Sequence, residues 1–94
     1  MPLFVATYDY TDDVQARDKI RPSHREFLGG LESNLASGPT DAAGAFLIFE
    51  AASADEVEGL LDADPFMIAG IVRERRVVAW TPVLGRWVAD GRIP

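Results

Sequence analysis

The only histidine of the chain, His24, carries the side chain best suited to acid–base chemistry. An imidazole ordinarily titrates near ~6.5, so it can exchange protons at neutral pH. Read at helical spacing, the histidine shares one side of an expected helix with the apolar residues Ile20, Phe27, Leu28, Leu31 and Leu35. An imidazole on such a stripe is either a buried ring satisfied by a backbone carbonyl or a group that moves protons.

Asp64 is the candidate partner for this histidine. A carboxylate that accepts a hydrogen bond from one imidazole nitrogen fixes the tautomer and leaves the other nitrogen as a general acid or base. Asp64 also fits a second role, because Asp64-Pro65 is typical of a helix start with a capping aspartate and a first-turn proline. Asp62 is a rival that we expect to be solvated at a helix end. The sequence leaves open whether His24 and Asp64 meet.

Four further residues are candidates for contacting a ligand. Tyr8, on an expected strand, either offers its hydroxyl to a cleft or is a core or interface tyrosine. Arg21 and Arg25 flank the histidine and either hold a substrate carboxylate in a bidentate manner or belong to a solvated helix face. Phe66 is either a wall of the pocket or plain core.

The elements that must position these residues follow from alternation and from turn signals. We expect strands at about 3–10, 36–40, 45–51 and 72–80, and helices at about 21–33, 53–62 and 64–70. Asp12-Asp13 ends a polar turn after the first strand, and Pro22 suits the first turn of the first helix, after an irregular or single-turn segment from about Ala16. Imperfect alternation around Arg75-Arg76 predicts a bulge or a change of pairing partner there. The order predicts an α+β fold of the ferredoxin-like β-α-β-β-α-β type, with two helical segments on one face of a four-stranded antiparallel sheet.

The other face of that sheet is expected to be covered by a second copy of the chain. Both faces of the first and third strands are apolar, which favours a homodimer or a higher homo-oligomer with facing sheets. Residues 1–94 are interpreted as a single domain. Its extension, 81–94, contains Val83, Leu84 and Trp87 and is expected to pack on its own or a neighbouring subunit.

Composition excludes several classes of function. The net charge of −6 argues against nucleic-acid partners, and the run Arg73 to Arg76 fits a solvated strand edge or an interface rim. With no cysteine and one histidine, neither a zinc–thiolate site nor another transition-metal centre is expected. We expect no cofactor, no membrane partner and a cytoplasmic location. Ser37 and Thr40 are hydrogen-bond donors near the hairpin without the elbow motif of a nucleophilic serine.

Several short motifs occur in the order found in one known family. They are Arg21-Pro22-Ser23-His24, Gly38-Pro39, the strand 44–50, Asp62-Ala63-Asp64-Pro65-Phe66 and Ala69-Gly70-Ile71. Over about residues 2 to 80 the chain resembles the YciI-like (YCII-related) family, which is itself similar to the dimeric α+β barrel proteins. The resemblance implies that His24 and Asp64 form an acid–base dyad. The chain departs from the family pattern at Gly29-Gly30 and after Trp80, where the shape of the pocket would differ.

The resemblance also takes in chloromuconolactone dehalogenase and so implies proton abstraction beside a carbonyl, a lyase or isomerase type of step. We therefore expect a small-molecule enzyme that uses the His24/Asp64 pair without a metal. Three alternatives stay open: a non-catalytic dimeric module that binds a small ligand, a cofactor-independent monooxygenase, for which the fold alone is a weak argument, and a dimerising subunit of a larger assembly.

Overall fold

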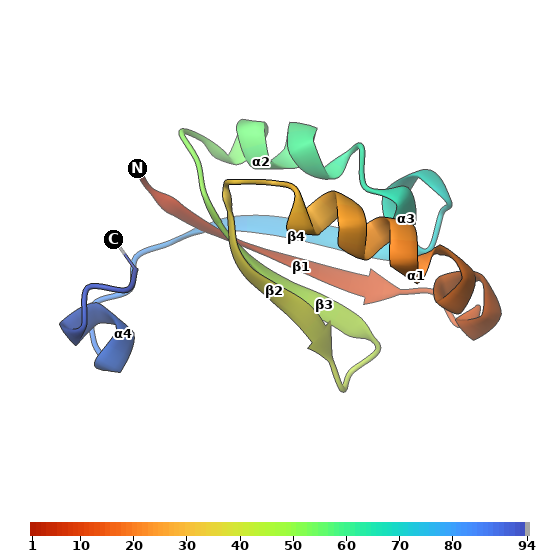
Figure 1. Cartoon of the computed structure of the whole chain (residues 1–94), viewed down its shortest axis with the longest axis horizontal. Coiled ribbons are helices and arrows are strands. Elements are labelled where there is room, and N and C mark those ends of the chain that lie inside the picture. The colour runs from red at the N-terminus through yellow and green to blue at the C-terminus, as the bar shows by residue number, and fades with distance from the viewer. Residues whose placement is uncertain (94) are drawn as a thin grey trace.

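The computed structural model describes residues 1–93, in which one antiparallel sheet is covered on one face by helices (Figure 1). The elements are β1 (Leu3–Tyr10), α1 (Val14–Gly29), β2 (Asn34–Thr40), β3 (Gly44–Glu50), α2 (Ala54–Leu61), α3 (Pro65–Ile68), β4 (Val72–Trp80) and α4 (Arg86–Ala89). The strand order is β2-β3-β1-β4, so β1 lies in the middle of the sheet. This arrangement confirms the predicted ferredoxin-like α+β fold.

Alternation along β1 decides which side chains meet the helices. Phe4, Ala6, Tyr8 and Tyr10 belong to the buried core, so the helix-facing side of this strand carries both tyrosines of the chain. Beside them on the same face of the sheet lie Ala45, Leu47 and Phe49 of β3. The helices contribute Leu28, Val57, Leu61 and Phe66 to the same core. The helical layer and the sheet therefore enclose one core, and Tyr8 and Tyr10 stand on its sheet side.

The first helix begins earlier than predicted. Instead of starting near Arg21, α1 starts at Val14, where the Asp13 side chain accepts a hydrogen bond from the Ala16 N–H at 3.0 Å. Pro22 consequently lies inside the helix rather than in its first turn. The expected helix was too short because a proline was interpreted as a start signal and Asp12-Asp13 as a turn. The longer helix carries His24 in its middle, on the buried side.

The two later helices begin where the capping residues predict. Ser53 accepts a hydrogen bond from the Glu56 N–H at 3.1 Å, and Asp64 accepts one from the Phe66 N–H at 3.0 Å. Gly70, with a φ of 71°, follows α3 in a conformation that suits glycine. The chain thus turns sharply on both sides of α3, which fixes where Asp64 lies.

Two local expectations about the strands were wrong. The irregularity in β4 lies opposite Asp9 and Tyr10, near its start, and not at Arg75-Arg76. Leu35, expected on the apolar side of the first helix, lies at an irregularity of β2 and is exposed. The first error arises because a bulge depends on the register between strands, which the pattern along one strand does not reveal. The second arises because α1 ends at Gly29, so the helical spacing does not extend to Leu35.

The second face of the sheet carries apolar side chains in register. Val5 pairs with Ile48 on β3 and with Val78 on β4, and Val78 and Phe46 are 40% and 43% exposed. Beyond this sheet α4 stands apart from the main body in Figure 1. In the extension Leu84 is 87% exposed, and residue 94 lies outside the described residues. The packing of residues 81–94 on the same or a neighbouring subunit stays a prediction. Within residues 1–93 no helix is long and apolar enough to cross a membrane.

Gly44 supports a testable prediction about the centre of the sheet. A Cβ at this position would lie 2.1 Å from the backbone oxygen of Tyr8, so Gly44→Ala must push β3 away from β1. We expect this variant to lose about 1–3 kcal/mol of unfolding free energy, measured by urea denaturation. Gly38→Ala is the matched control in the neighbouring strand, because its Cβ would meet no atom within 4 Å. Equal stability of the two variants would contradict the prediction.

Candidate active site

The site is organised around the carboxylate of Asp64, which is fully buried. Its Oδ2 accepts a hydrogen bond of 2.8 Å from the Tyr8 hydroxyl, and its Oδ1 accepts one of 3.0 Å from the Phe66 N–H. His24 Nδ1 lies 2.8 Å from Oδ1 and 3.0 Å from Oδ2. Residues from β1, α1 and the start of α3 therefore converge on one side chain.

This geometry determines which imidazole nitrogen carries the proton. An ionised carboxylate only accepts hydrogen bonds, so Nδ1 of His24 must be the protonated nitrogen that donates to Asp64. In the neutral ring Nε2 is then unprotonated and has a free lone pair. Asp64 thus sets the tautomer that a general base requires.

Phe66 holds the plane of the imidazole. The two rings are stacked with centroids 3.8 Å apart and an angle of 5° between their planes. Tyr10 meets the edge of Phe66 in a T-shaped contact, with centroids 5.4 Å apart. The hydrogen bond to Asp64 and the stacking contact together leave the His24 ring little freedom to rotate.

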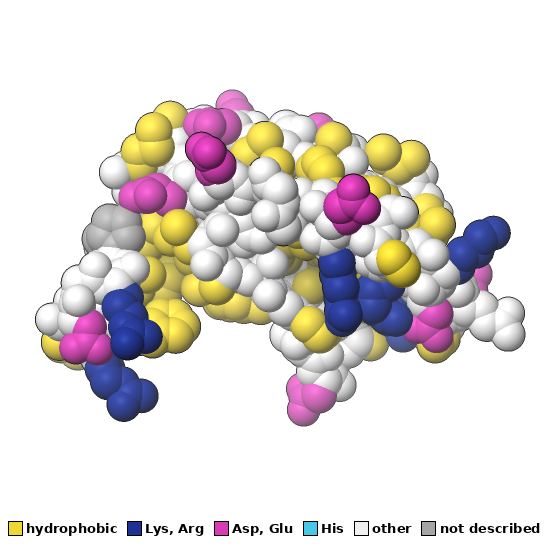
Figure 2. All heavy atoms as spheres, viewed as in Figure 1, with side chains coloured by type: hydrophobic (Ala, Val, Ile, Leu, Met, Phe, Trp, Pro, Cys, Tyr) yellow, Lys and Arg dark blue, Asp and Glu magenta, His cyan; other side chains and the backbone are white. Residues whose placement is uncertain are grey.

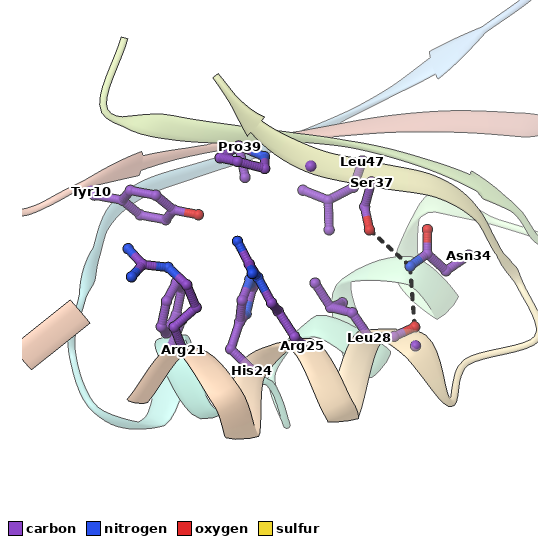
Figure 3. A pocket seen from close by; sticks show the side chains of 13 residues that line it. Tyr10, Arg21, His24, Arg25, Leu28, Asn34, Ser37, Pro39 and Leu47 are labelled. Carbon is purple, nitrogen blue, oxygen red and sulfur yellow. Dashed lines mark hydrogen bonds between the residues drawn. The ribbon is translucent and has the colours of Figure 1, made fainter. Parts of the chain in front are cut away.

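A cavity of about 330 Å³ opens beside the histidine. Its walls come from the end of β1, one side of α1, and strands β2 and β3, and Figure 3 shows the His24 ring and the Tyr10 hydroxyl directed into it. Its described lining includes Tyr10, Arg21, His24, Arg25, Leu28, Asn34, Ser37, Pro39, Leu47 and Phe66. The volume suits a compact organic molecule.

Comparison with known proteins identifies the family of the chain. The YCII-related domain model matches residues 1–81. The chain belongs to the YCII-related domain family. Among curated proteins, none matches the chain significantly.

One similar structure is 5-chloro-2-hydroxyhydroquinone dehydrochlorinase from Burkholderia phenoliruptrix, solved with 2,5-dihydroxybenzoquinone. It is 31% identical, with a TM-score of 0.77, over 84% of this chain and 93% of that chain. An AsnC-family transcriptional regulator from Pyrococcus furiosus is 11% identical, with a TM-score of 0.63, over 88% of this chain and 54% of that chain. An antibiotic biosynthesis monooxygenase is 16% identical, with a TM-score of 0.58, over 89% of this chain and all (100%) of that chain. The last two share the fold alone.

Of the candidate ligand-contacting residues predicted from the sequence, four line the cavity and one does not. The cavity is lined by His24, Arg21, Arg25 and Phe66. Tyr8 is not among its described lining residues, and its hydroxyl donates a hydrogen bond to Asp64 instead. Phe66 is both pocket wall and core, because it is almost completely buried. The rival carboxylate Asp62 is solvated, as expected, and pairs with Arg75 at 2.8 Å.

Two polar lining residues were missed in the sequence. Tyr10 stands on the same face of β1 as Tyr8, one step nearer the strand end, where the cavity opens. Asn34 begins β2 and donates through Nδ2 to the Leu28 carbonyl at 3.1 Å and to Ser37 Oγ at 3.0 Å. Alternation could have identified Tyr10, whereas the position of Asn34 depends on where α1 ends.

Both tyrosines of the YCII-related site are held in the protonated form. Burial raises the pKa of Tyr8 far above its ordinary value of about 10, and the nearby Asp64 carboxylate raises it further. Burial likewise raises the pKa of Tyr10, with a smaller contribution from Asp64. Among the described residues, no three side chains of the metal-binding acidic and histidine types converge as ligands would.

The raised tyrosine pKa values predict a loss of stability in alkali. Because the unfolded chain ionises its tyrosines near pH ~10 and the folded chain does so only at higher pH, their stabilisation is complete below that pH and is lost above it. We expect the free energy of unfolding to fall by about 1.4 kcal/mol per pH unit for each tyrosine above pH ~10.

Urea denaturation followed by circular dichroism at several pH values measures this slope, and absorbance near 295 nm reports tyrosinate. Tyr8→Phe should roughly halve the slope, since Tyr8 and Tyr10 are the only two tyrosines. Tyrosinate that forms with an ordinary pKa in the folded protein would refute the prediction.

Proposed function

We propose that this protein is an enzyme that removes a proton beside a carbonyl of a compact, oxygenated ring, with His24 as the general base and Asp64 as the residue that orients it. One observation carries the proposal. His24 Nδ1 is occupied by the buried Asp64, so Nε2 is the nitrogen that the ring offers to the cavity it lines. A histidine that served only the core would have no need of a cavity beside its second nitrogen.

The chemistry that follows is an elimination or an isomerisation. His24 Nε2 takes a proton from the carbon next to a carbonyl, and the electron pair of the broken C–H bond moves to the carbonyl oxygen as an enolate. In an elimination this pair returns to form a C=C bond while a neighbouring C–Cl bond breaks and chloride leaves with its electrons. In an isomerisation the imidazolium returns the proton to a different carbon.

Asp64 acts on the imidazole and not on the substrate. Protonation of Nε2 makes the ring a cation, which the adjacent carboxylate stabilises through its 2.8 Å contact with Nδ1. Tyr8 and the Phe66 amide hold the carboxylate in place from the other side. The buried pair therefore stabilises the charge that appears during proton transfer.

Similarity to the dehydrochlorinase from Burkholderia phenoliruptrix supports the elimination over other reactions. That protein removes hydrogen chloride from a chlorinated hydroxyhydroquinone according to its name, and this chain is 31% identical to it over most of both lengths. We propose that this protein accepts the same class of substrate, a hydroxylated six-membered ring that bears a leaving group.

A chlorinated hydroxyhydroquinone enters the elimination as its keto tautomer, in which the carbon that bears chlorine also carries a hydrogen and lies beside a carbonyl. His24 Nε2 here takes the proton of the ring hydroxyl para to that carbonyl instead of a carbon-bound one, and the O–H electrons form a second C=O bond. The adjacent C=C pair shifts toward the chlorinated carbon, and chloride leaves with the electrons of the C–Cl bond to give the hydroxybenzoquinone.

Chloride release from 5-chloro-2-hydroxyhydroquinone tests the proposal. His24→Gln and Asp64→Asn should each lower the rate by about 10²–10⁴, because a positioned general base contributes that much. Asp62→Asn is the matched control: the same substitution two residues away, on an exposed carboxylate that pairs with Arg75, should leave the rate unchanged. Circular dichroism verifies that each variant is folded.

Release by His24→Gln at the wild-type rate would contradict the role of the histidine. If the wild-type protein binds the ring but releases no chloride, the non-catalytic binding module is the better description. Equal losses in Asp62→Asn and Asp64→Asn would indicate that general loss of negative charge, and not the dyad, limits the rate.

We also propose that two copies of the chain pack through the open face of the sheet. The exposed Phe46 and Val78 lie on that face with Val5 and Ile48, and such a patch favours burial against a like surface. The interface should exceed about 1,200 Å² in total. The extension after Trp80 is proposed to contact the neighbouring subunit.

Sedimentation velocity at micromolar concentration should show a dimer that Phe46→Glu converts to a monomer, because the charge would be buried without a partner. Ile68→Glu is the control, since Ile68 is equally apolar and 74% exposed but belongs to α3 in the helical layer. A monomeric wild-type protein, or a Phe46→Glu variant that remains dimeric, would exclude this interface.

A further inference from the structure

Three arginines of α1 follow one another at intervals of four residues. Arg17, Arg21 and Arg25 therefore lie along one side of the helix, although like charges at this spacing repel and the whole chain has a net charge of −6. All three partly offset the rise that burial causes in the pKa of Tyr10, so their positive charge acts on a residue that lines the cavity. Figure 2 shows basic side chains gathered in the hollow between α1 and the β2–β3 hairpin.

Two of these three guanidinium groups are already engaged. Arg17 lies over the Tyr10 ring, with its Cζ 5.0 Å from the ring centroid, and contacts the Thr11 carbonyl. Arg21 forms an ion pair with Asp18. Arg25 lines the cavity and has no ion pair or side-chain hydrogen bond within residues 1–93. One uncompensated positive charge therefore faces the ligand space beside His24.

The opposite walls add hydrogen-bond donors. The Tyr10 hydroxyl points into the cavity in Figure 3 and, within the described part of the chain, makes no hydrogen bond. Burial raises the pKa of Tyr10, so this hydroxyl retains its proton at neutral pH. Ser37 Oγ accepts a hydrogen bond from Asn34, whose amide is fixed by the Leu28 carbonyl, so the Ser37 proton is left to donate elsewhere.

We infer that the cavity selects its ligand in the anionic form, a compact ring with a negatively charged oxygen bound by the Arg25 guanidinium. Arg21 reinforces the positive field, and the Tyr10 and Ser37 hydroxyls donate to the remaining oxygens of the ring. His24 Nε2 is then the acceptor left for the proton that is removed. Only the role of His24 as proton acceptor rests on the proposed function. The binding of an oxyanion is inferred from the positive charge of Arg25 and from the hydroxyl donors of Tyr10 and Ser37.

Paired probes, of which one is an anion at neutral pH and the other a neutral analogue of the same ring, test the inference by isothermal titration calorimetry. The pair 2,5-dihydroxybenzoquinone and 2,5-dimethoxybenzoquinone examines an enolic oxygen, and the pair benzoate and benzamide examines a carboxylate. We expect at least one anionic probe to bind at least ~10-fold more tightly than its neutral counterpart. The pair that shows the preference identifies the type of oxyanion.

Arg25→Gln should abolish this preference, Arg25→Lys should retain part of it, and Lys19→Gln should leave it unchanged. Lys19→Gln is the matched control because this substitution also removes one positive charge from α1, while Lys19 is not among the described residues that line the cavity. Equal affinity for the charged and neutral probes, or an unchanged preference in Arg25→Gln, would overturn the inference.

The outcome is separable from that of the proposed function. His24→Gln should keep the preference for the anion while it loses chloride release. If His24→Gln loses the preference and Arg25→Gln keeps it, the imidazolium is the binding cation and the inference is wrong, whatever the rate of the reaction. If Arg25→Gln loses the preference and His24→Gln still releases chloride, the inference stands and the proposed base is wrong.

Discussion

A fully buried carboxylate must be compensated, and the compensation of Asp64 determines the rest of the site. Leaving an ionised aspartate without partners in a core would cost several kcal/mol, so three donors from three elements surround it. These donors are a tyrosine hydroxyl from β1, an imidazole N–H from α1 and a backbone N–H from α3. The packing of both helices on the central strand and the tautomer of the histidine therefore depend on the same charge.

This arrangement explains how one aspartate both caps a helix and holds the histidine. Asp64 caps α3 through the Phe66 N–H, and the same oxygen, Oδ1, receives the His24 proton donor. The following Pro65 starts the helix and places Phe66 where its ring stacks on the imidazole. A short helix of four residues thus supplies both the carboxylate and the ring that hold His24. The helix cap and the contact with His24, which the sequence presented as alternatives for Asp64, therefore both occur.

The parts of the structure that sequence could predict are those set by local periodicity. Strand β1 and strand β4 lie where alternation places them, and Ser53 and Asp64 begin helices because capping is a local interaction. The early start of α1 was missed because Pro22 lies within the helix. Proline usually marks a boundary, and only the surrounding tertiary packing makes its interior position tolerable.

The candidate site shows the same division between local and long-range information. The spacing of apolar residues predicts that His24 lies on the buried side of a helix. Its contact with Asp64 joins residues forty positions apart, which spacing cannot predict, so that expectation comes from the family motifs alone. Which of the two tyrosines reaches the cavity depends on its position along β1. Alternation predicts only that both lie on the same face of the strand. Tyr8 lies at the level of Asp64 and holds it, while Tyr10, two residues nearer the strand end, reaches the cavity.

The two tyrosines therefore separate the structural half of the site from its chemical half. Behind the imidazole, Tyr8 and Asp64 form a sealed hydrogen-bonded pair whose proton stays in place, since burial holds the pKa of the Tyr8 hydroxyl high. In front of it, Tyr10 and the arginines of α1 present donors and positive charge to the cavity. The imidazole lies between these two halves: its Nδ1 is held by the buried carboxylate, and the ring lines the cavity that also contains Arg25. The same histidine therefore belongs both to the rigid hydrogen-bonded core and to the ligand space. The compensation of one buried carboxylate thus fixes the orientation of the group that a ligand in the cavity would meet.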